Sequence, residues 1–124
     1  MAALFTQVYE VGSVPVDGLL RVRRGDTLSV GFVLSDAGGP IDLTGFTGAC
    51  QLRPTPDADG AVSLTVTIPT PTSGQVDIYL SAATTATLAP GQWSWDLELT
   101  GPAGDVTTVI GGRALISADT TRSL

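Results

Sequence analysis

Two carboxylates, Asp96 and Glu98, stand two residues apart in the segment "QWSWDLELTG". In a strand, both side chains lie on one face, and their separation approaches that of the carboxylate pair of a glycosidase. Such a pair also requires a deep cleft and surroundings that keep one acid protonated, and neither is encoded nearby. Acidic residues on the solvated face of a strand are the simpler interpretation, so we expect no catalytic site here.

A second acidic pair, Asp57 and Asp59, precedes Gly60 in "PTPDADGA" and resembles the start of a calcium-binding loop. That loop needs further oxygen ligands and a bidentate Glu about six residues later, and "AVSLTV" offers neither. We therefore predict a hairpin turn and no metal site, with a site completed by a neighbouring chain as the open alternative.

The tripeptide Arg24-Gly25-Asp26 is the sequence that animal cell-adhesion receptors read on exposed loops. It stands directly before a strand predicted over residues 28–34, where a chain entering a sheet commonly turns sharply. Gly25 supplies the backbone angles that such a corner needs, and Asp26 can accept hydrogen bonds from nearby amides. We interpret the tripeptide as a strand entrance, because an adhesive loop would have to protrude.

Trp93 and Trp95 raise the question of carbohydrate binding, since exposed tryptophans stack on sugar rings. Alternation places both on one strand face with Leu97 and Leu99. That face is apolar, so core packing is favoured over a ligand platform. A carbohydrate-binding module remains the alternative from a second class of function.

The inventory of reactive side chains is short. The chain has no His and no Lys, so neither a Ser-His-Asp triad nor its Ser-Lys variant can be built. Cys50 is the single cysteine, which excludes an internal disulfide and a thiolate metal cluster, and we expect it to be a small buried apolar residue. No glycine-rich phosphate-binding motif occurs. We expect a protein that is not an enzyme and that binds no cofactor.

Composition restricts the partners. The 124 residues suit one domain, 43% of them are hydrophobic, and the net charge is −6. An acidic chain with six Arg as its cations disfavours nucleic acid and anionic membranes as partners. The start lacks the basic and apolar regions of a secretory signal, and no apolar run approaches the length of a membrane span.

Apolar residues recur with period two in short runs separated by Gly and Pro. This pattern predicts an all-β, immunoglobulin-like antiparallel sandwich of about seven strands over residues 20–124. Ser81 is predicted to cap one helical turn, and Leu88 to fill the core beneath it. The predicted strand segments are "TLSVGFVLS", "FTGACQLRP", "AVSLTVTIP", "GQVDIYLS", "QWSWDLELTG" and "VTTVIGGRALIS". The last of these is expected to form one or two strands.

Residues 1–19 fit this pattern less well, because Pro15 and Gly18 interrupt a brief alternation. We predict an N-terminal arm or an added edge strand that docks on a neighbour. The predicted interface residues are the apolar side chains of the arm and three arginines beyond it. They are Leu4, Phe5, Val8, Tyr9, Val11, Arg21, Arg23 and Arg24.

Several short motifs follow one another in a set order along residues 20–122. They are "PIDLTG" at 40–45, "GQVDIYLS" at 74–81, "LAPG" at 88–91, "WSWDL" at 93–97 and "DTTR" at 119–122. In this order they resemble the immunoglobulin-like N-terminal domain of baseplate upper proteins and related tail or fibre proteins of tailed bacteriophages.

The resemblance implies a structural virion protein, an assembly or adaptor module of the tail, baseplate or fibre attachment. It would bind other virion proteins and copies of itself, and it would be made in the bacterial cytoplasm and reside on the tail or capsid surface. Capsid decoration is the alternative within the same class.

Overall fold

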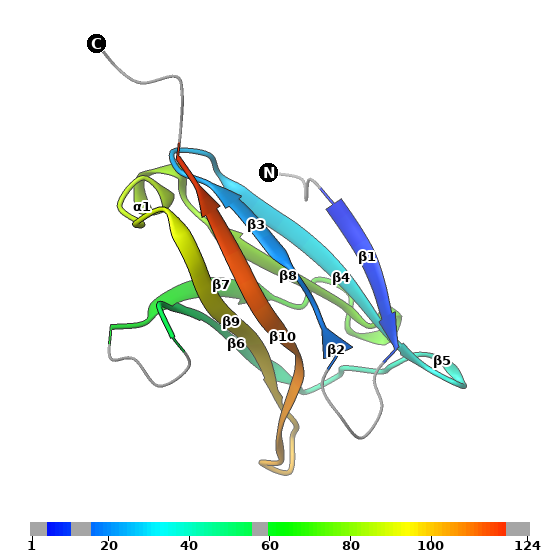
Figure 1. The fold of residues 1–124 in the computed structure, drawn as a ribbon. Helices are drawn as coiled ribbons and strands as arrows, with labels where there is room; N and C mark the ends of the chain where they lie inside the picture. Colours follow the sequence, from blue (N-terminus) through cyan, green and yellow to red (C-terminus); the bar gives the residue numbers. More distant parts are fainter. Residues whose placement is uncertain (1–4, 11–15, 56–59, 119–124) are drawn as a thin grey trace.

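Short strands separated by tight turns make up most of the described chain (Figure 1). The computed structural model describes residues 5–10, 16–55 and 60–118, with the backbone alone described for 5–10 and 16–17. The strands are β1 (Phe5–Glu10), β2 (Val16–Asp17), β3 (Leu20–Arg23), β4 (Leu28–Asp36), β5 (Gly39–Pro40), β6 (Thr47–Arg53), β7 (Val62–Thr67), β8 (Gln75–Leu80), β9 (Gly91–Thr100) and β10 (Val106–Ser117). Two helical turns interrupt them, η1 (Pro71–Ser73) and α1 (Ala82–Thr85).

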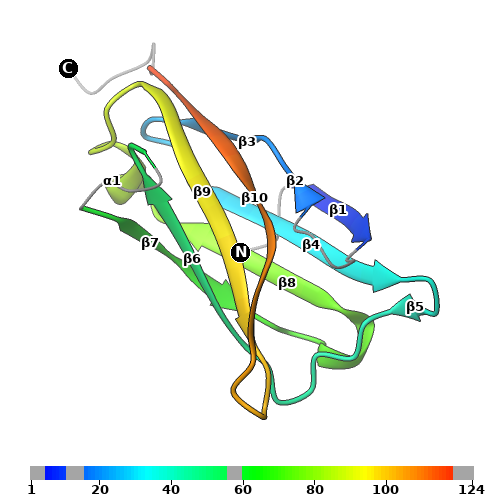
Figure 2. The ribbon, with the colours of Figure 1, turned by 60° about the horizontal axis from the view of Figure 1, so that its bottom comes forward.

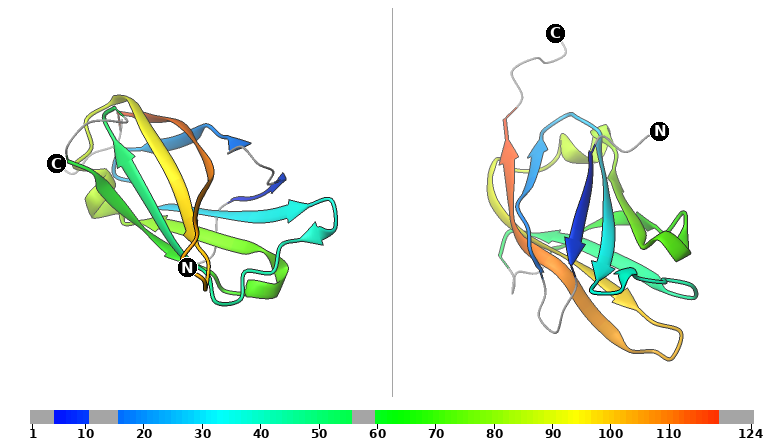
Figure 3. Two further views of the ribbon diagram at one scale, coloured as in Figure 1. Left: turned by 90° about the horizontal axis from the view of Figure 1, so that it is seen from below. Right: turned by 90° about the vertical axis from the view of Figure 1, so that its right-hand side faces the viewer.

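The strands form two layers that face each other, which confirms the predicted all-β sandwich (Figure 2). Sheet A has the order β1-β4-β8-β7, with β5 beside β4. Sheet B has the order β7-β6-β9-β10, with β2 and β3 both beside β10. Strand β7 belongs to both sheets, because its first half pairs with β6 and its second half with β8. The opposite side of the sandwich is bordered by β1 and β3 (Figure 3).

The strands before β4 depart from the predicted antiparallel pattern. Strand β1 pairs in parallel with β4, and β2 and β3 pair in parallel with β10. These strands and β5 raise the number of strands above the seven expected, because segments of two to six residues carry too weak a periodic signal. Residues 5–10 therefore add an edge strand to sheet A, and residues 16–17 extend sheet B.

Alternation along the strands builds the core. Leu28, Val30, Phe32 and Leu34 all point inward from β4, as predicted, and each is at most 8% exposed. Each such side chain contributes about 1.5–3 kcal/mol when it leaves water. The other strands contribute Leu20, Val22, Cys50, Leu52, Leu64, Val76, Ile78, Leu80, Trp95, Leu97, Leu99, Val109, Ile110, Ala114 and Ile116.

The connection after β8 folds as predicted. Ser81 is the N-cap of α1, where its hydroxyl accepts a hydrogen bond from the Thr84 amide at 3.3 Å. Leu88 is 2% exposed and fills the core below this turn. The chain then enters β9 at Gly91.

The "PIDLTG" bend precedes β6. Leu43 is fully buried, and Asp42 accepts hydrogen bonds from the Thr44 amide at 3.0 Å and the Thr44 hydroxyl at 2.6 Å. The Thr44 hydroxyl and amide hold the pKa of Asp42 below its usual value. The bend thus anchors one apolar side chain and satisfies its own turn amide.

Candidate interaction surfaces

Arg24, Gly25 and Asp26 form the turn between β3 and β4. The Asp26 amide donates to the Arg23 carbonyl at 3.1 Å, and Gly25 has φ +81°. A positive φ at the third position of a four-residue turn is the mark of a type II turn, which favours Gly there. The tripeptide is therefore a strand entrance, as its position in the sequence indicated.

The turn is tied to α1 through side chains of both segments. The Arg24 Nη2 donates to the Ala86 carbonyl at 3.0 Å, and the buried Thr85 hydroxyl donates to the Asp26 carbonyl at 2.7 Å. Arg24 was expected at an interface, but its guanidinium is half-buried against its own chain. Its Nε is buried and meets no hydrogen-bond acceptor among the described residues.

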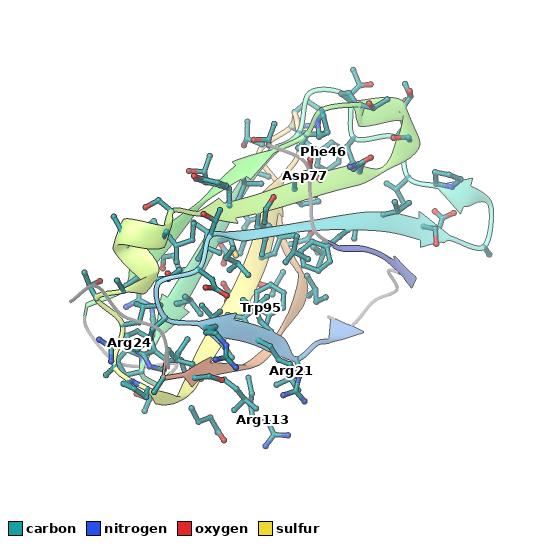
Figure 4. The ribbon with its side chains drawn as sticks, turned by 90° about the horizontal axis from the view of Figure 1, so that it is seen from above. Arg21, Arg24, Phe46, Asp77, Trp95 and Arg113 are labelled. Carbon is teal, nitrogen blue, oxygen red and sulfur yellow. The ribbon has the colours of Figure 1, made fainter. Side chains whose placement is uncertain are left out.

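Arg21 and Arg23 are exposed on the outer face of sheet B, because they alternate with the buried Leu20 and Val22 along β3. Register places Arg21 opposite Leu115 and Arg23 opposite Ser117 on β10. Arg113, which was not among the predicted interface residues, is also exposed, two positions before Leu115 on the same strand. Figure 4 shows the Arg21 and Arg113 side chains extending from this edge of the sheet.

A shallow hollow of about 520 Å³ lies beside these arginines on the same outer face. Its floor includes Gly111 and Gly112 of β10, where a Cβ on Gly111 would come within 3.0 Å of the Asp96 Cβ. Its described lining is Ala49, Gln51, Arg53, Ser94, Trp95, Asp96, Glu98, Gly111 and Gly112. Asp96 and Glu98, the carboxylates considered above as a catalytic pair, therefore lie on an open sheet face. Asp96 is exposed and Glu98 is half-buried.

A second hollow of about 530 Å³ lies between β3 and β4, where the two sheets separate. Leu20, Val22, Leu28, Val30 and Phe32 contribute apolar surface to it. On this open side of the sandwich, core side chains thus line a hollow that reaches the surface.

Trp95 and Trp93 pack as the alternation predicted. Trp95 is 4% exposed, stacks on Phe32 with ring centroids 5.9 Å apart, and donates its indole N–H to the Gly18 carbonyl at 3.0 Å. Trp93 is half-buried against the core and donates to the Ala89 carbonyl at 2.9 Å. The two rings form no paired stacking platform for a sugar.

Cys50 lies in the core at 1% exposure. Burial raises the pKa of its thiol to about 12, with a smaller contribution from the charge of Asp96. A protonated, buried thiol is neither a nucleophile nor a metal ligand, so the predicted apolar role fits its surroundings.

The remaining predicted residues lie in strand β1 or outside the described residues. Phe5, Val8 and Tyr9 belong to β1, opposite Val30, Val33 and Leu34 of β4 in register. Leu4 and Val11 lie outside the described residues, as do Asp57 and Asp59, for which a hairpin turn was predicted. No group of three or more potential metal-ligating side chains occurs among the residues that are described. No helix within the same residues is long and apolar enough to span a membrane.

The basic side chains on sheet B were only partly predictable. Arg21 and Arg23 were predicted, together with Arg24, as ionic contacts at an interface. Arg113 was missed because it is 90 residues away in sequence, and only the parallel pairing of β3 with β10 brings it near them. The sequence held one signal that Arg113 is exposed: it follows Gly111-Gly112 and alternates with the apolar Ala114.

Comparison with known proteins reveals a likeness in structure alone. No protein-family model and no curated protein matches the chain. Its structure is similar to that of the N-terminal domain of phage TP901-1 ORF48, with a TM-score of 0.61, 11% sequence identity, and coverage of 92% of this chain and 99% of that chain. The chain shares the fold of a phage protein domain.

Other solved structures superpose less well. The cysteine protease inhibitor EhICP2 from Entamoeba histolytica gives a TM-score of 0.43 at 12% identity, over 90% of this chain and 96% of that chain. The internalin-like protein lmo2027 of Listeria monocytogenes gives a TM-score of 0.42 at 11% identity, over 85% of this chain and 28% of that chain. At these TM-scores neither likeness supports an inference about this chain.

Proposed function

We propose that this chain is a non-enzymatic structural protein of a tailed-phage virion, an assembly or adaptor module of the tail, baseplate or fibre attachment. The observation that carries the proposal is the superposition of almost the whole chain on almost the whole N-terminal domain of phage TP901-1 ORF48. The order of motifs that resembles baseplate upper proteins supports the same class of function independently of the coordinates.

The surface of the molecule supports binding as its activity. Described ionisable side chains lie on open faces and turns, and the thiol that could act as a nucleophile is buried and protonated. Strand β3 forms one edge of sheet B, with exposed arginines on its outer face. Edge strands and exposed charged faces are the features through which a small sandwich contacts its neighbours.

Labelling of intact particles tests the proposal. An antibody raised against the purified chain, or a peptide tag on its gene, is expected to decorate tailed particles at the tail, baseplate or fibre attachment. Tail-less capsids from the same lysate are the control, and they should stay unlabelled. Label on capsid shells alone would move the protein to the alternative role in capsid decoration. Purified particles of both kinds without label would refute the proposal.

A further inference from the structure

Three arginines gather on the outer face of sheet B at the β3–β10 edge. This basic patch consists of Arg21, Arg23 and Arg113, all of them exposed. Diagonal neighbours on adjacent strands are about 7–8 Å apart, so like charges at these positions repel one another. Within the part of the chain that is described, none of the three makes an ion pair. Asp96 is the diagonal neighbour of Arg113 on β9 and offsets part of this repulsion, whereas the outward-facing Arg21 and Arg23 remain available to carboxylates of another molecule.

The opposite end of the sandwich is acidic. Strand β4 runs from the α1 end to Asp36, and the β9–β10 hairpin carries Asp105 at that same far end (Figure 1). Asp42 lies in the adjoining bend, and the hairpin contacts that bend, because a Cβ on Gly45 would lie 3.2 Å from the Pro102 Cγ. We call Asp36, Asp42 and Asp105 the acidic end, and all three are exposed.

The arginines of the basic patch and the carboxylates of the acidic end are separated along the strands. Arg23 and Arg113 belong to the halves of β3 and β10 nearer α1, whereas Asp36 and Asp105 lie at the ends of β4 and the hairpin farthest from it. No basic side chain lies at the acidic end among the residues described. Asp96 and Glu98 lie on the same outer face of sheet B as the basic patch, and Asp26 lines a hollow together with Arg21 and Arg23. The acidic end is therefore the surface of uniform charge, and the basic patch presents its arginines beside carboxylates of the same chain.

We propose that the basic patch of one copy docks on the acidic end of a second copy. Because the two surfaces differ, the contact is heterologous, and repeating it yields a closed ring or an open stack. Guanidinium groups pair with carboxylates through short charge-assisted hydrogen bonds, which fixes the orientation of the two copies. The inference rests on the proposed function, since a virion module that meets copies of itself needs such a surface.

Two neutralising double variants test the contact in the full-length chain. Arg21→Gln/Arg113→Gln removes charge from the basic patch, and Asp36→Asn/Asp105→Asn removes it from the acidic end. Sedimentation velocity at low salt, up to about 1 mM chain, covers interfaces as weak as a Kd near 1 mM. We expect the native chain to form oligomers that dissociate as salt increases. Each double variant should associate at least about tenfold more weakly, which is the loss of about one charged pair.

Mixing the two variants gives the sharpest readout. Each retains one intact surface, so an equimolar mixture should form a one-to-one dimer and nothing larger. Asp26→Asn is the matched control, because it removes an exposed carboxylate beside the basic patch and should not weaken association. Circular dichroism and an unchanged urea midpoint establish that each variant is folded.

Several outcomes would overturn the docking surface. They are a native chain that sediments as a monomer throughout, variants that associate as strongly as the native chain, and a mixture that forms no dimer. Binding of a labelled oligonucleotide that needs Arg21 and Arg113, with no association of the chain, would assign the patch to nucleic acid instead. None of these results depends on particle labelling, so the docking surface can fail while the virion role stands, and the reverse.

Discussion

The indole N–H of Trp95 donates to the carbonyl oxygen of Gly18 at 3.0 Å, across 77 positions in sequence. The bond ties the middle of β9 to the chain between β2 and β3, and Gly18 in turn donates its amide to the Gly111 carbonyl at 2.8 Å. The edge of sheet B that carries the basic patch is therefore held to the core by a side-chain hydrogen bond as well as by the backbone pairing of β3 with β10.

Trp95→Phe should destabilise the fold by about 1–3 kcal/mol, because it leaves the Gly18 carbonyl without its donor in a partly buried place. Trp93→Phe is the matched control: its bond to Ala89 is exposed, so water replaces the donor at a smaller cost. Urea unfolding followed by circular dichroism measures both. Equal losses in the two variants would mean that the Trp95 bond does not fasten the edge.

Thr85→Val should cost about 1–3 kcal/mol of unfolding free energy. Thr85 is fully buried, and its hydroxyl lies 2.7 Å from the Asp26 carbonyl and 3.1 Å from the Ala82 carbonyl. Valine keeps the shape and removes the donor. Thr87→Val, which loses an exposed bond to the Thr84 carbonyl, should change the urea midpoint little. A neutral Thr85→Val would show that this hydrogen bond does not stabilise the strand entrance.

Gly74→Ala should be more damaging than Gly104→Ala, although both glycines have positive φ. A Cβ on Gly74 would lie 2.4 Å from the Leu34 carbonyl oxygen, which is backbone and cannot move aside, whereas nothing lies within 4 Å of one on Gly104. We expect about 1–2 kcal/mol of backbone strain at Gly104 and about 3 kcal/mol or more at Gly74. Thermal unfolding gives the order, and similar losses at the two sites would contradict it.

Cys50 should make stability depend on pH in the alkaline range. Its folded pKa of about 12 lies above the ordinary thiol value of 9.0, so the folded chain keeps a proton that the unfolded chain loses. The stabilisation is complete below pH 9 and declines between about pH 9 and 12, by about 1.4 kcal/mol per pH unit.

The comparison with Cys50→Ala isolates this contribution. The alanine variant is less stable at neutral pH because of its cavity, but it lacks the thiol, so its urea midpoint should decline less from pH 8 to pH 10.5. Parallel declines in the two proteins would exclude the buried thiol as the source. In the native protein the thiol should also resist a thiol reagent until urea unfolds the chain.

Alternation was sufficient to predict strands β4 and β6 to β9, since an apolar period of two runs along each of them. Strand β10 was predicted as one or two strands, and a bulge between Thr108 and Ile110 interrupts its alternation. The same argument placed Trp95, Leu97 and Leu99 inside and predicted that Cys50 is a core residue. Strands β2, β3 and β5 span two to four residues, too few for a period to be recognised, so their pairing depends on partners far away in sequence.

The sequence by itself determined the sandwich class, the capped turn after β8 and the strand entrance at Arg24 to Asp26, because these depend on local periodicity and on the backbone preferences of Gly and Ser. Tertiary structure alone decided that the N-terminal strands pair in parallel, that Arg113 joins Arg21 and Arg23, and that the acidic turns gather at the far end. Those relationships depend on which strands become neighbours. Burial of the shared core selects the strand order, because it needs side chains from segments that are far apart in sequence.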